Sequence, residues 1–469
     1  MIDQIDNYEV AEHQVFKVDG KYYLFLVKSS ALFEMGGESH RLIDAIKKRE
    51  ASYLRSLKGK IKDDLIILKD IGAIQRINEP SHEGAKSRED LPGQSLVSLV
   101  CILSGDCNLR CAYCYADHVS YKGKRRGAKE EVIYRGVDFL LEEGGGNREV
   151  NLTFFGGEPL LNFPVLKSAL KYARRKAREK QRNIGFSLTT NATLLTEDII
   201  SFLDDEGVSI TVSIDGSGHI HDAVRKYPDG RGSYDVILNN LQRLFKRYRR
   251  KPVNARVTVV HGQVNIKDIF SHLSKIGFKD IGFSPVSTDN PLYSLTGNDL
   301  DIFTGYFGEL SEDYLKRAIN GEKFGFSNLS NLLKLIHEGT NKNYPCGGGL
   351  GLMGMGIDGE LYVCHRFINN SRFYLGNIKE GIDRNIQRDF FNKMHLNKKI
   401  LCQDCWARYL CGGGCYYEIE LQSKGFEVPP TKYCKWLKEW FVRGVEVYIR
   451  IMQSNPDFIK RVIDSSIYC

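Results

Sequence analysis

Residues 107–114 read CNLRCAYC, and this stretch decides the fold because it places three cysteines shortly after an apolar run at 96–103. Three thiolates this close together can bind three corners of an iron–sulfur cube, since soft thiolate ligands suit iron and sulfide. The fourth iron would then lack a protein ligand and could bind a substrate or cofactor. A zinc site with a distant fourth ligand is the alternative, although zinc-binding cysteine pairs are usually spaced differently.

The segment around this stretch alternates apolar runs with amphipathic stretches. The apolar runs predict strands at 96–103, 150–155, 184–190, 208–214, 253–260 and 281–286. The amphipathic stretches predict helices at 129–143, 164–181, 195–204, 234–246, 265–276 and 300–319. Six strand–helix units in a row indicate an α/β fold with a parallel sheet and helices outside it, either open or closed as a barrel.

The first 90 residues predict a separate unit. Residues 15–26 read as two strands joined by Asp19-Gly20, which is a strong hairpin signal. Helices are expected at about 40–50 and 61–71, the second ending near Gly72. A hairpin followed by two helices outlines a small winged-helix unit, and the polar, turn-rich residues 79–95 predict a linker after it.

The composition of the chain, 469 residues with 42% hydrophobic and 26% charged residues, is typical of a globular protein with roughly two to four domains. No apolar run approaches the ~18 residues of a membrane-spanning helix, and the first residues do not resemble a signal peptide. We therefore expect a cytoplasmic protein with no membrane partner. The net charge of +8 is concentrated in two basic runs, residues 174–182 and 246–251. They predict solvated helix faces or a docking surface for an acidic peptide, and no nucleic-acid recognition module accompanies them.

Ten of the twelve cysteines fall into two groups, the first at 107–114 and the second at 346–434. Disulfide scaffolds also cluster cysteines, but this chain is large and shows no export signal, so metal ligation is favoured. The remaining two, Cys101 in a predicted strand and Cys469, are expected to have structural or incidental roles.

The first group, Cys107, Cys111 and Cys114 with Tyr113 before the last cysteine, resembles the signature of the radical S-adenosylmethionine (SAM) enzymes. The resemblance implies a partial barrel of six strand–helix units with a 4Fe–4S cluster at its C-terminal mouth. It also implies that SAM binds the open iron through its amino and carboxylate groups. An electron from the cluster then cleaves SAM to methionine and a 5′-deoxyadenosyl radical, which abstracts hydrogen from the substrate.

The predicted strands end in residues that the same resemblance assigns to SAM. The stretch FGGEP at 155–159 is assigned to the amino group, and polar residues after the third and fourth strands are assigned to the ribose and the methionine carboxylate. The implied SAM contacts are Tyr113, Gly156, Gly157, Glu158, Asn191, Ser213, Asp215 and Arg225. Without the resemblance, GGEP is only a turn and the polar residues only cap strand ends. Together they fit a ligand site at the mouth of a parallel barrel.

The second cysteine group is similar to the SPASM extension of radical SAM enzymes, which holds two auxiliary 4Fe–4S clusters. The resemblance assigns Cys346, Cys364 and Cys415 to the auxiliary cluster nearer the SAM site; we call these three the nearer set. It assigns Cys402, Cys405, Cys411 and Cys434 to the outer auxiliary cluster; we call these four the outer set. A zinc ribbon is the alternative, but it would use four cysteines and leave three unexplained. Regular structure is expected to thin after about residue 325 and to return as a helix at 435–464.

The anaerobic sulfatase-maturing members have an eighth cysteine shortly after the first, and residues 347–361 contain none. This departure argues against sulfatase maturation and leaves the nearer set one ligand short of a cube. Substrate thiolate is one candidate for the open iron, and a carboxylate or water is the other.

These expectations combine into a partial (β/α)6 radical SAM barrel at 95–325, preceded by a winged-helix-like leader-recognition unit at 1–90 and followed by a SPASM region at 326–469. The expected cofactors are SAM and three 4Fe–4S clusters. The expected partners are a precursor peptide with a leader and a reducing donor such as flavodoxin or ferredoxin.

The expected function is a peptide maturase that forms thioethers between a substrate cysteine and a carbon of another residue. Another radical modification, such as a carbon–carbon cross-link or formylglycine formation, is the alternative within the family. A catalytically silent electron-transfer or peptide-binding protein is the alternative outside it. No general base can be named from the sequence.

Overall fold

The computed structural model describes residues 8–56, 61–77, 95–116, 126–423, 425 and 431–465. Cys469 and the expected linker, apart from residue 95, lie outside these residues. None of the helices within the described ranges has the length and apolar character needed to cross a membrane.

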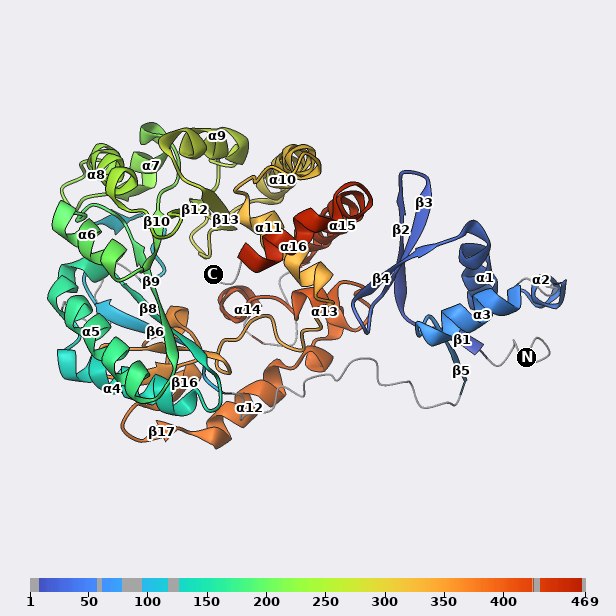
Figure 1. Ribbon diagram of the computed structural model, residues 1–469, viewed down its shortest axis with the longest axis horizontal. Coiled ribbons are helices and arrows are strands. Elements are labelled where there is room, and N and C mark those ends of the chain that lie inside the picture. The colour runs from blue at the N-terminus through green and yellow to red at the C-terminus, as the bar shows by residue number, and fades with distance from the viewer. Residues whose placement is uncertain are drawn as a thin grey trace.

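A ten-stranded sheet runs through the larger part of the molecule, in the order β13-β12-β10-β9-β8-β6-β14-β15-β16-β17 (Figure 1). Six neighbouring strands pair in parallel, as the sequence predicts. They are β6 (Ser98–Ser104), β8 (Glu149–Gly156), β9 (Asn183–Thr190), β10 (Ser209–Ser213), β12 (Asn254–Val259) and β13 (Asp280–Pro285). The α/β prediction is confirmed, and the sheet is open because β13 forms one of its edges.

Helices cover the outer side of these strands (Figure 1). They are α4 (Glu130–Glu143), α5 (Phe163–Glu179), α6 (Glu197–Asp205), α7 (Gly218–Val224), α8 (Tyr234–Arg247), α9 (Ile266–Ile276) and α10 (Gly297–Ile319). Helix α9 shows why they form: its buried residues Ile266, Ile269, Phe270 and Leu273 recur at the helical spacing that gives one apolar face. The helix begins where the Asn265 side chain accepts a hydrogen bond from a backbone N–H of the first turn, and it ends at a glycine with positive φ.

The sheet continues into the C-terminal third of the chain, because β14 (Leu352–Met355) pairs in parallel with β6. Three antiparallel strands follow, β15 (Glu360–Tyr362), β16 (Tyr374–Asn377) and β17 (Gly381–Ile382). The helices of this third are α11 (Ser327–His337), α12 (Arg384–Met394), α13 (Arg408–Cys411), α14 (Tyr416–Ser423), α15 (Thr431–Ser454) and α16 (Pro456–Ser465). The expected C-terminal helix is therefore two helices, and α11 to α14 and the four strands were not predicted from the sequence.

The N-terminal residues form a small unit with its own hydrophobic core. Strands β2 (His13–Val18) and β3 (Lys21–Leu26) make the predicted hairpin, with Asp19 and Gly20 both at positive φ as a tight turn requires. A third strand, β4 (Ala31–Met35), was not predicted. The other elements are β1 (Tyr8–Val10), α1 (Gly37–Lys48), α2 (Ala51–Ser56), α3 (Ile61–Asp70) and β5 (Ile74–Arg76).

This unit packs against the C-terminal third of the chain (Figure 1). Phe16 and Phe25 make edge-on contacts with Trp406, at ring-centroid distances of 5.5 and 5.7 Å. The Gln453 side chain of α15 donates a hydrogen bond to the Tyr23 hydroxyl. The hairpin is therefore held against α15 and the loop that carries Trp406.

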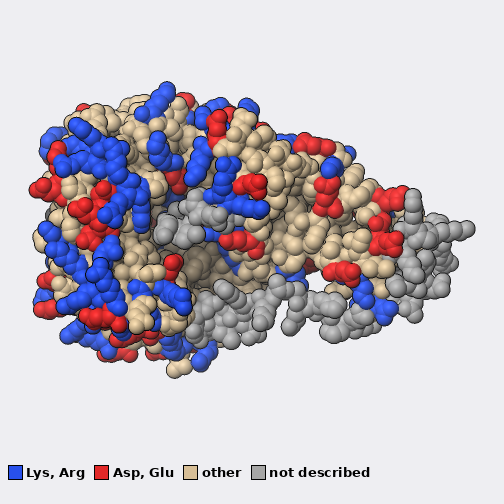
Figure 2. Space-filling model, viewed as in Figure 1, with Lys and Arg blue, Asp and Glu red and all other residues tan. Residues whose placement is uncertain are grey.

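The basic runs lie on or beside α5 and α8, and several of their side chains pair with acidic ones. Arg174 pairs with Glu206 at 2.6 Å, and Lys176 with Glu179 at 3.0 Å. Figure 2 shows basic and acidic side chains interspersed over the side of the molecule where α4, α5 and α6 lie. These contacts favour the solvated-face interpretation of the runs over a docking surface.

Candidate functional site

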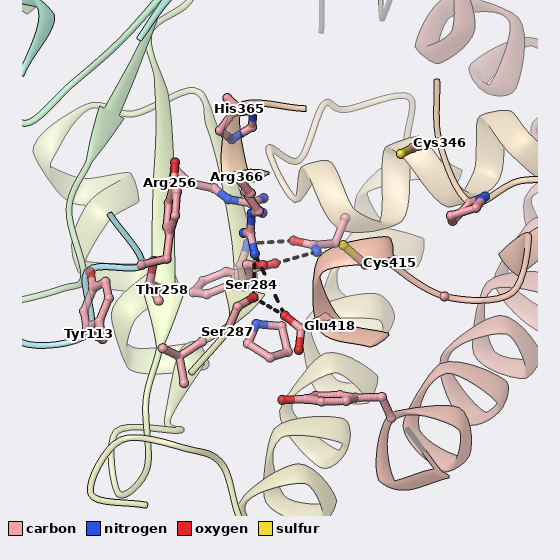
Figure 3. A pocket seen from close by; sticks show the side chains of 18 of the residues that line it. Tyr113, Arg256, Thr258, Ser284, Ser287, Cys346, His365, Arg366, Cys415 and Glu418 are labelled. Carbon is pink, nitrogen blue, oxygen red and sulfur yellow. Dashed lines mark hydrogen bonds and ion pairs between the residues drawn. The ribbon is translucent and has the colours of Figure 1, made fainter. Parts of the chain in front are cut away.

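One large cavity, with a volume of about 1240 Å³, contains residues of both cysteine groups. Its walls come from the carboxyl ends of the parallel strands on one side and from the loops of the C-terminal third on the other (Figure 3). The cysteines that line it are Cys107, Cys111, Cys114, Cys346, Cys402, Cys405, Cys411, Cys415 and Cys434. The structure thus brings together cysteines that lie more than 300 residues apart in the sequence.

The first cysteine group lies in the loop that follows β6, as the sequence predicts. Within this loop, β7 (Arg110–Cys111) pairs with β11 (Arg225–Lys226), a short contact that the sequence analysis missed. Burial raises the pKa of the Cys107 thiol to about 12 and that of Cys111 to about 11. Binding iron would therefore have to displace protons from these thiols.

Gly156 and Gly157 lie where the end of β8 meets the cysteine loop. A Cβ atom on Gly156 would lie 2.4 Å from the Ser104 carbonyl oxygen, and one on Gly157 would lie 2.2 Å from that of Asp106. Neither position can carry a side chain without moving the cysteine loop. Both glycines line the cavity, so the backbone is exposed to a ligand there.

Glu158 lies behind this wall and does not line the cavity. Its side chain is fully buried and accepts hydrogen bonds from the Thr190 hydroxyl at 2.7 Å and from the backbone N–H groups of Asn191 and Leu160 at 2.7 and 3.0 Å. Burial raises its pKa to about 7. The carboxylate thus fixes the end of β9, and it does not face the cavity as contact with the amino group of SAM would require.

Asp215, Arg225 and Tyr113 form a buried network beside the first cysteine group. Arg225 donates from Nε to the Asp215 carboxylate at 2.7 Å, and the Tyr113 hydroxyl donates to the same oxygen. The Arg225 guanidinium also lies over the Tyr113 ring, 5.3 Å from its centroid, and 3.8 Å from the Cys111 sulfur. Arg225 and Tyr113 line the cavity with Asn191 and Ser213, whereas Asp215 lies behind them.

In the second cysteine group, neighbouring thiols influence one another's pKa. Electrostatic interactions join Cys346, Cys364 and Cys415 to one another. A separate network of such interactions joins Cys402, Cys405, Cys411 and Cys434. Cys364 belongs to the nearer set but does not line the cavity.

The loop between Cys411 and Cys415 is shaped by three glycines, all at positive φ. A Cβ on Gly412 would lie 2.4 Å from the Tyr344 carbonyl oxygen, so this loop packs directly on the segment that leads to Cys346. Lys399 is fully buried here and donates from Nζ to the Gly413 carbonyl at 2.8 Å. It interacts electrostatically with cysteines of both sets and adds a positive charge between them.

The middle of the cavity holds charged residues that the sequence analysis did not single out. Arg256 on β12 and Arg366 lie between Tyr113 on one side and Cys346 and Cys415 on the other (Figure 3). An arginine inside the apolar run 253–260 was the available signal, because a charged side chain in a buried strand needs a polar partner or a cavity.

The donor chemistry of both groups fits iron–sulfur clusters. Nine cysteines line the cavity, and backbone N–H groups point at the Cys107 and Cys346 sulfurs at 3.4 Å, as is typical around the thiolate ligands of iron–sulfur clusters. Across the described ranges, no three Cys, His, Asp or Glu side chains gather as they would around one metal ion. Cluster ligands bind different irons and need not converge in this way.

Comparison with known proteins identifies the centre of this architecture. The sequence profile of the radical SAM superfamily matches residues 101–276, which include β6, the first cysteine group and the strands through β12. The chain carries a radical SAM domain. This family implies SAM and a 4Fe–4S cluster as cofactors, as the sequence predicts.

Two relatives show how far the sequence likeness extends. The cysteine-type anaerobic sulfatase-maturating enzyme of Clostridium novyi (strain NT) is 24% identical over 368 residues, which cover 75% of this chain and 96% of that protein. The radical SAM cyclopropyl synthase TigE of Paramaledivibacter caminithermalis is 23% identical over 442 residues, covering 86% and 88%. The likeness to sulfatase-maturating enzymes is therefore greater than the missing eighth cysteine suggested, and it extends beyond the residues that the radical SAM profile matches.

Two solved structures share its fold. Native anSMEcpe with bound AdoMet and Cp18Cys peptide has a TM-score of 0.64 at 24% identity, covering 77% of this chain and 99% of that one. Streptococcus suis SuiB bound to precursor peptide SuiA has a TM-score of 0.51 at 14% identity, covering 90% and 98%. The second alignment extends over more of this chain.

Proposed function

We propose that this protein is a radical SAM maturase that forms a thioether between a cysteine sulfur of a precursor peptide and a carbon of another residue. The observation that carries the proposal is the single cavity that both cysteine groups line. It is large enough for a peptide segment as well as SAM. Two structural neighbours were solved with a peptide bound, which supports a peptide as the substrate class.

In this proposal, residues at one end of the cavity bind SAM and its cluster, and residues at the other end hold the clusters that accept an electron. Cys107, Cys111 and Cys114 would hold the cluster that, with SAM bound, supplies the 5′-deoxyadenosyl radical. Asn191, Ser213 and Arg225 line the neighbouring wall and would orient SAM. The cysteines of the second group would hold the acceptor clusters at the other end.

Thioether formation balances only if one electron leaves the substrate. A hydrogen atom leaves carbon for the deoxyadenosyl radical, the thiol loses a proton, and closing the carbon–sulfur bond releases one electron. The second cysteine group supports such an acceptor role, and its nearer set offers three cysteines where a cube has four corners. A substrate thiolate would fit the remaining corner.

The N-terminal unit is proposed to bind the leader of the peptide. Strands β2 and β4 are the two edges of its three-stranded sheet, and α15 packs against β2. An extended leader would therefore add as a strand along β4, where unpaired backbone groups of an edge strand are available. Slower amide hydrogen exchange in β4 with the full-length precursor, but not with a leaderless core peptide, would support this assignment.

Formylglycine formation is the second candidate, because the Clostridium novyi relative is a sulfatase-maturating enzyme. The anaerobically reconstituted enzyme can be tested with the short peptide encoded beside its gene, SAM and a reductant. A thioether product loses two hydrogens and leaves its cysteine unreactive to alkylation, whereas formylglycine reacts with a hydrazide probe. Absence of 5′-deoxyadenosine under these conditions would contradict both candidates.

A further inference from the structure

Two arginines lie side by side in the middle of the cavity, between the two cysteine groups (Figure 3). Arg256 comes from β12 and Arg366 from the short helix His365–Phe367 that follows Cys364. Like charges this close repel each other, more strongly where protein has displaced water. The pair must therefore be balanced by nearby acceptors or by a ligand.

Arg366 already has partners within the chain. Its Nη1 donates to the Ser287 hydroxyl at 2.6 Å and lies 3.9 Å from a carboxylate oxygen of Glu418. Ser287 in turn is hydrogen bonded to Glu418. Within this group of three residues, the Glu418 carboxylate offsets the positive charge of Arg366.

Arg256 has no such partner among the residues that the structure describes. Its side chain is accessible from the cavity, yet its pKa is lowered to about 10, first by burial and then by repulsion from Arg366. Within the described part of the chain, no acidic group contributes to that pKa. The neighbouring strand offers Gly282 in register with Arg256, and a Cβ built there would lie 3.5 Å from Arg256 Nη1 and 2.8 Å from the Ser327 hydroxyl oxygen, so the guanidinium is flanked on this side by a glycine and a neutral hydroxyl.

We propose that Arg256, with Arg366 beside it, binds a carboxylate of the peptide substrate. This inference rests on the proposed function and narrows it to peptides that present an acidic side chain, or their C-terminal carboxylate, next to the modified position. A guanidinium offers a planar pair of N–H donors that matches a carboxylate, and a bound anion offsets the repulsion between the two arginines. The carboxylate that Arg256 binds could also be supplied by the methionine part of SAM, and the experiment below distinguishes the two sources.

The test uses a hexapeptide library with one fixed cysteine and five randomised positions, prepared as C-terminal amides and as free acids. Anaerobically reconstituted holoenzyme with saturating SAM captures peptides, which are then sequenced by mass spectrometry. With amidated peptides, the wild type should enrich Asp or Glu at one position by about tenfold, as expected for a desolvated charge pair. Preference for free acids without a side-chain preference would identify the C-terminal carboxylate instead.

Arg256→Met should remove this enrichment, whereas the control Arg231→Met, an exposed arginine paired with Asp229 outside the cavity, should retain it. Captured peptides with no preference for a carboxylate in the wild type would overturn the inference and leave the proposed function standing. Capture of no peptide at all would likewise overturn the inference, while the proposed function, in which a leader helps to bind the substrate, would be tested separately with the full-length precursor.

Two further measurements separate the remaining explanations. SAM affinity, measured by calorimetry, should change less than twofold in Arg256→Met, and a loss of tenfold or more would assign the guanidinium to SAM and overturn the inference. The melting temperature of the variant should be unchanged or higher, because an unpaired charge is removed. A clear fall would show that Arg256 supports the fold instead.

Discussion

The two cysteine groups share one cavity but are held in place by different means. The first group follows a regular strand, and buried side chains with full hydrogen bonding support its loop: Glu158 fixes the end of β9, and Asp215 joins Arg225 to Tyr113. The second group lies largely in loops shaped by glycines with positive φ and by the buried Lys399. The difference indicates that regular secondary structure and buried hydrogen bonds determine the first site, whereas the second would depend more on any metal that it binds.

The largest expected effect is the loss of SAM cleavage when the first cysteine group alone is removed. Replacing Cys107, Cys111 and Cys114 by Ala should abolish 5′-deoxyadenosine formation and lower iron content by one cluster, while the iron of the second group remains. The reason is that the two groups use different cysteines, which interact within each group. Iron content and product should be measured on the same reconstituted sample. Loss of all iron would show that the groups form one cooperative site.

The next largest effect concerns the buried support of the first group. Arg225→Met should lower the free energy of unfolding by about 3–5 kcal/mol, because it leaves the Asp215 carboxylate buried without its partner. The matched change at the second group, Arg366→Met, should cost about 1 kcal/mol, because both members of that pair are partly accessible to water. Urea unfolding of the apoproteins measures both. Equal losses would contradict the contrast drawn between the two groups.

A third effect is a pH dependence that belongs to the first group. Because the folded-state pKa of Glu158 is raised to about 7, the folded protein holds this proton over a range where the unfolded chain has lost it. Stability from this group is therefore present at low pH and declines as pH rises from about 4.5 to 7, by about 3 kcal/mol in all.

The comparison that isolates this effect is between the wild type and Glu158→Gln, unfolded with urea at pH 5 and pH 8. Other groups titrate equally in both proteins, so the difference between their pH dependences reports Glu158. The variant should be less stable at both pH values, because its side-chain amide cannot accept the bond from the Asn191 backbone N–H. Identical pH dependences would show that the carboxyl is ionised throughout this range.

The sequence predicts the first site better than the second for the same physical reason. Periodic apolar runs specify strands and helices, and parallel strands bring their carboxyl ends to one edge, so Gly156, Asn191 and Ser213 could be placed at one mouth. What could not be predicted is which side chains turn inward: Glu158 and Asp215 read as ligand contacts but lie behind the wall. Arg256 and Arg366 were missed because their pairing depends on two segments that meet only in the folded chain.

The smallest expected effect tests how far the glycines shape the second group. Gly412→Ala should cost more than the control Gly20→Ala, although both residues have similar positive φ values of 71° and 82°. A Cβ at Gly20 meets no atom within 4 Å, so that variant should lose only the conformational cost of about 1 kcal/mol. A Cβ at Gly412 meets the backbone of Tyr344 and Pro345 at 2.4–2.6 Å, and relieving this contact must move the segment that carries Cys346. We therefore expect an additional loss of about 1–2 kcal/mol in urea unfolding of the apoprotein, together with less iron retained by the second group after reconstitution. If both variants lost the same free energy and kept the same iron, the loop would be pliable, and the metal alone would set its conformation.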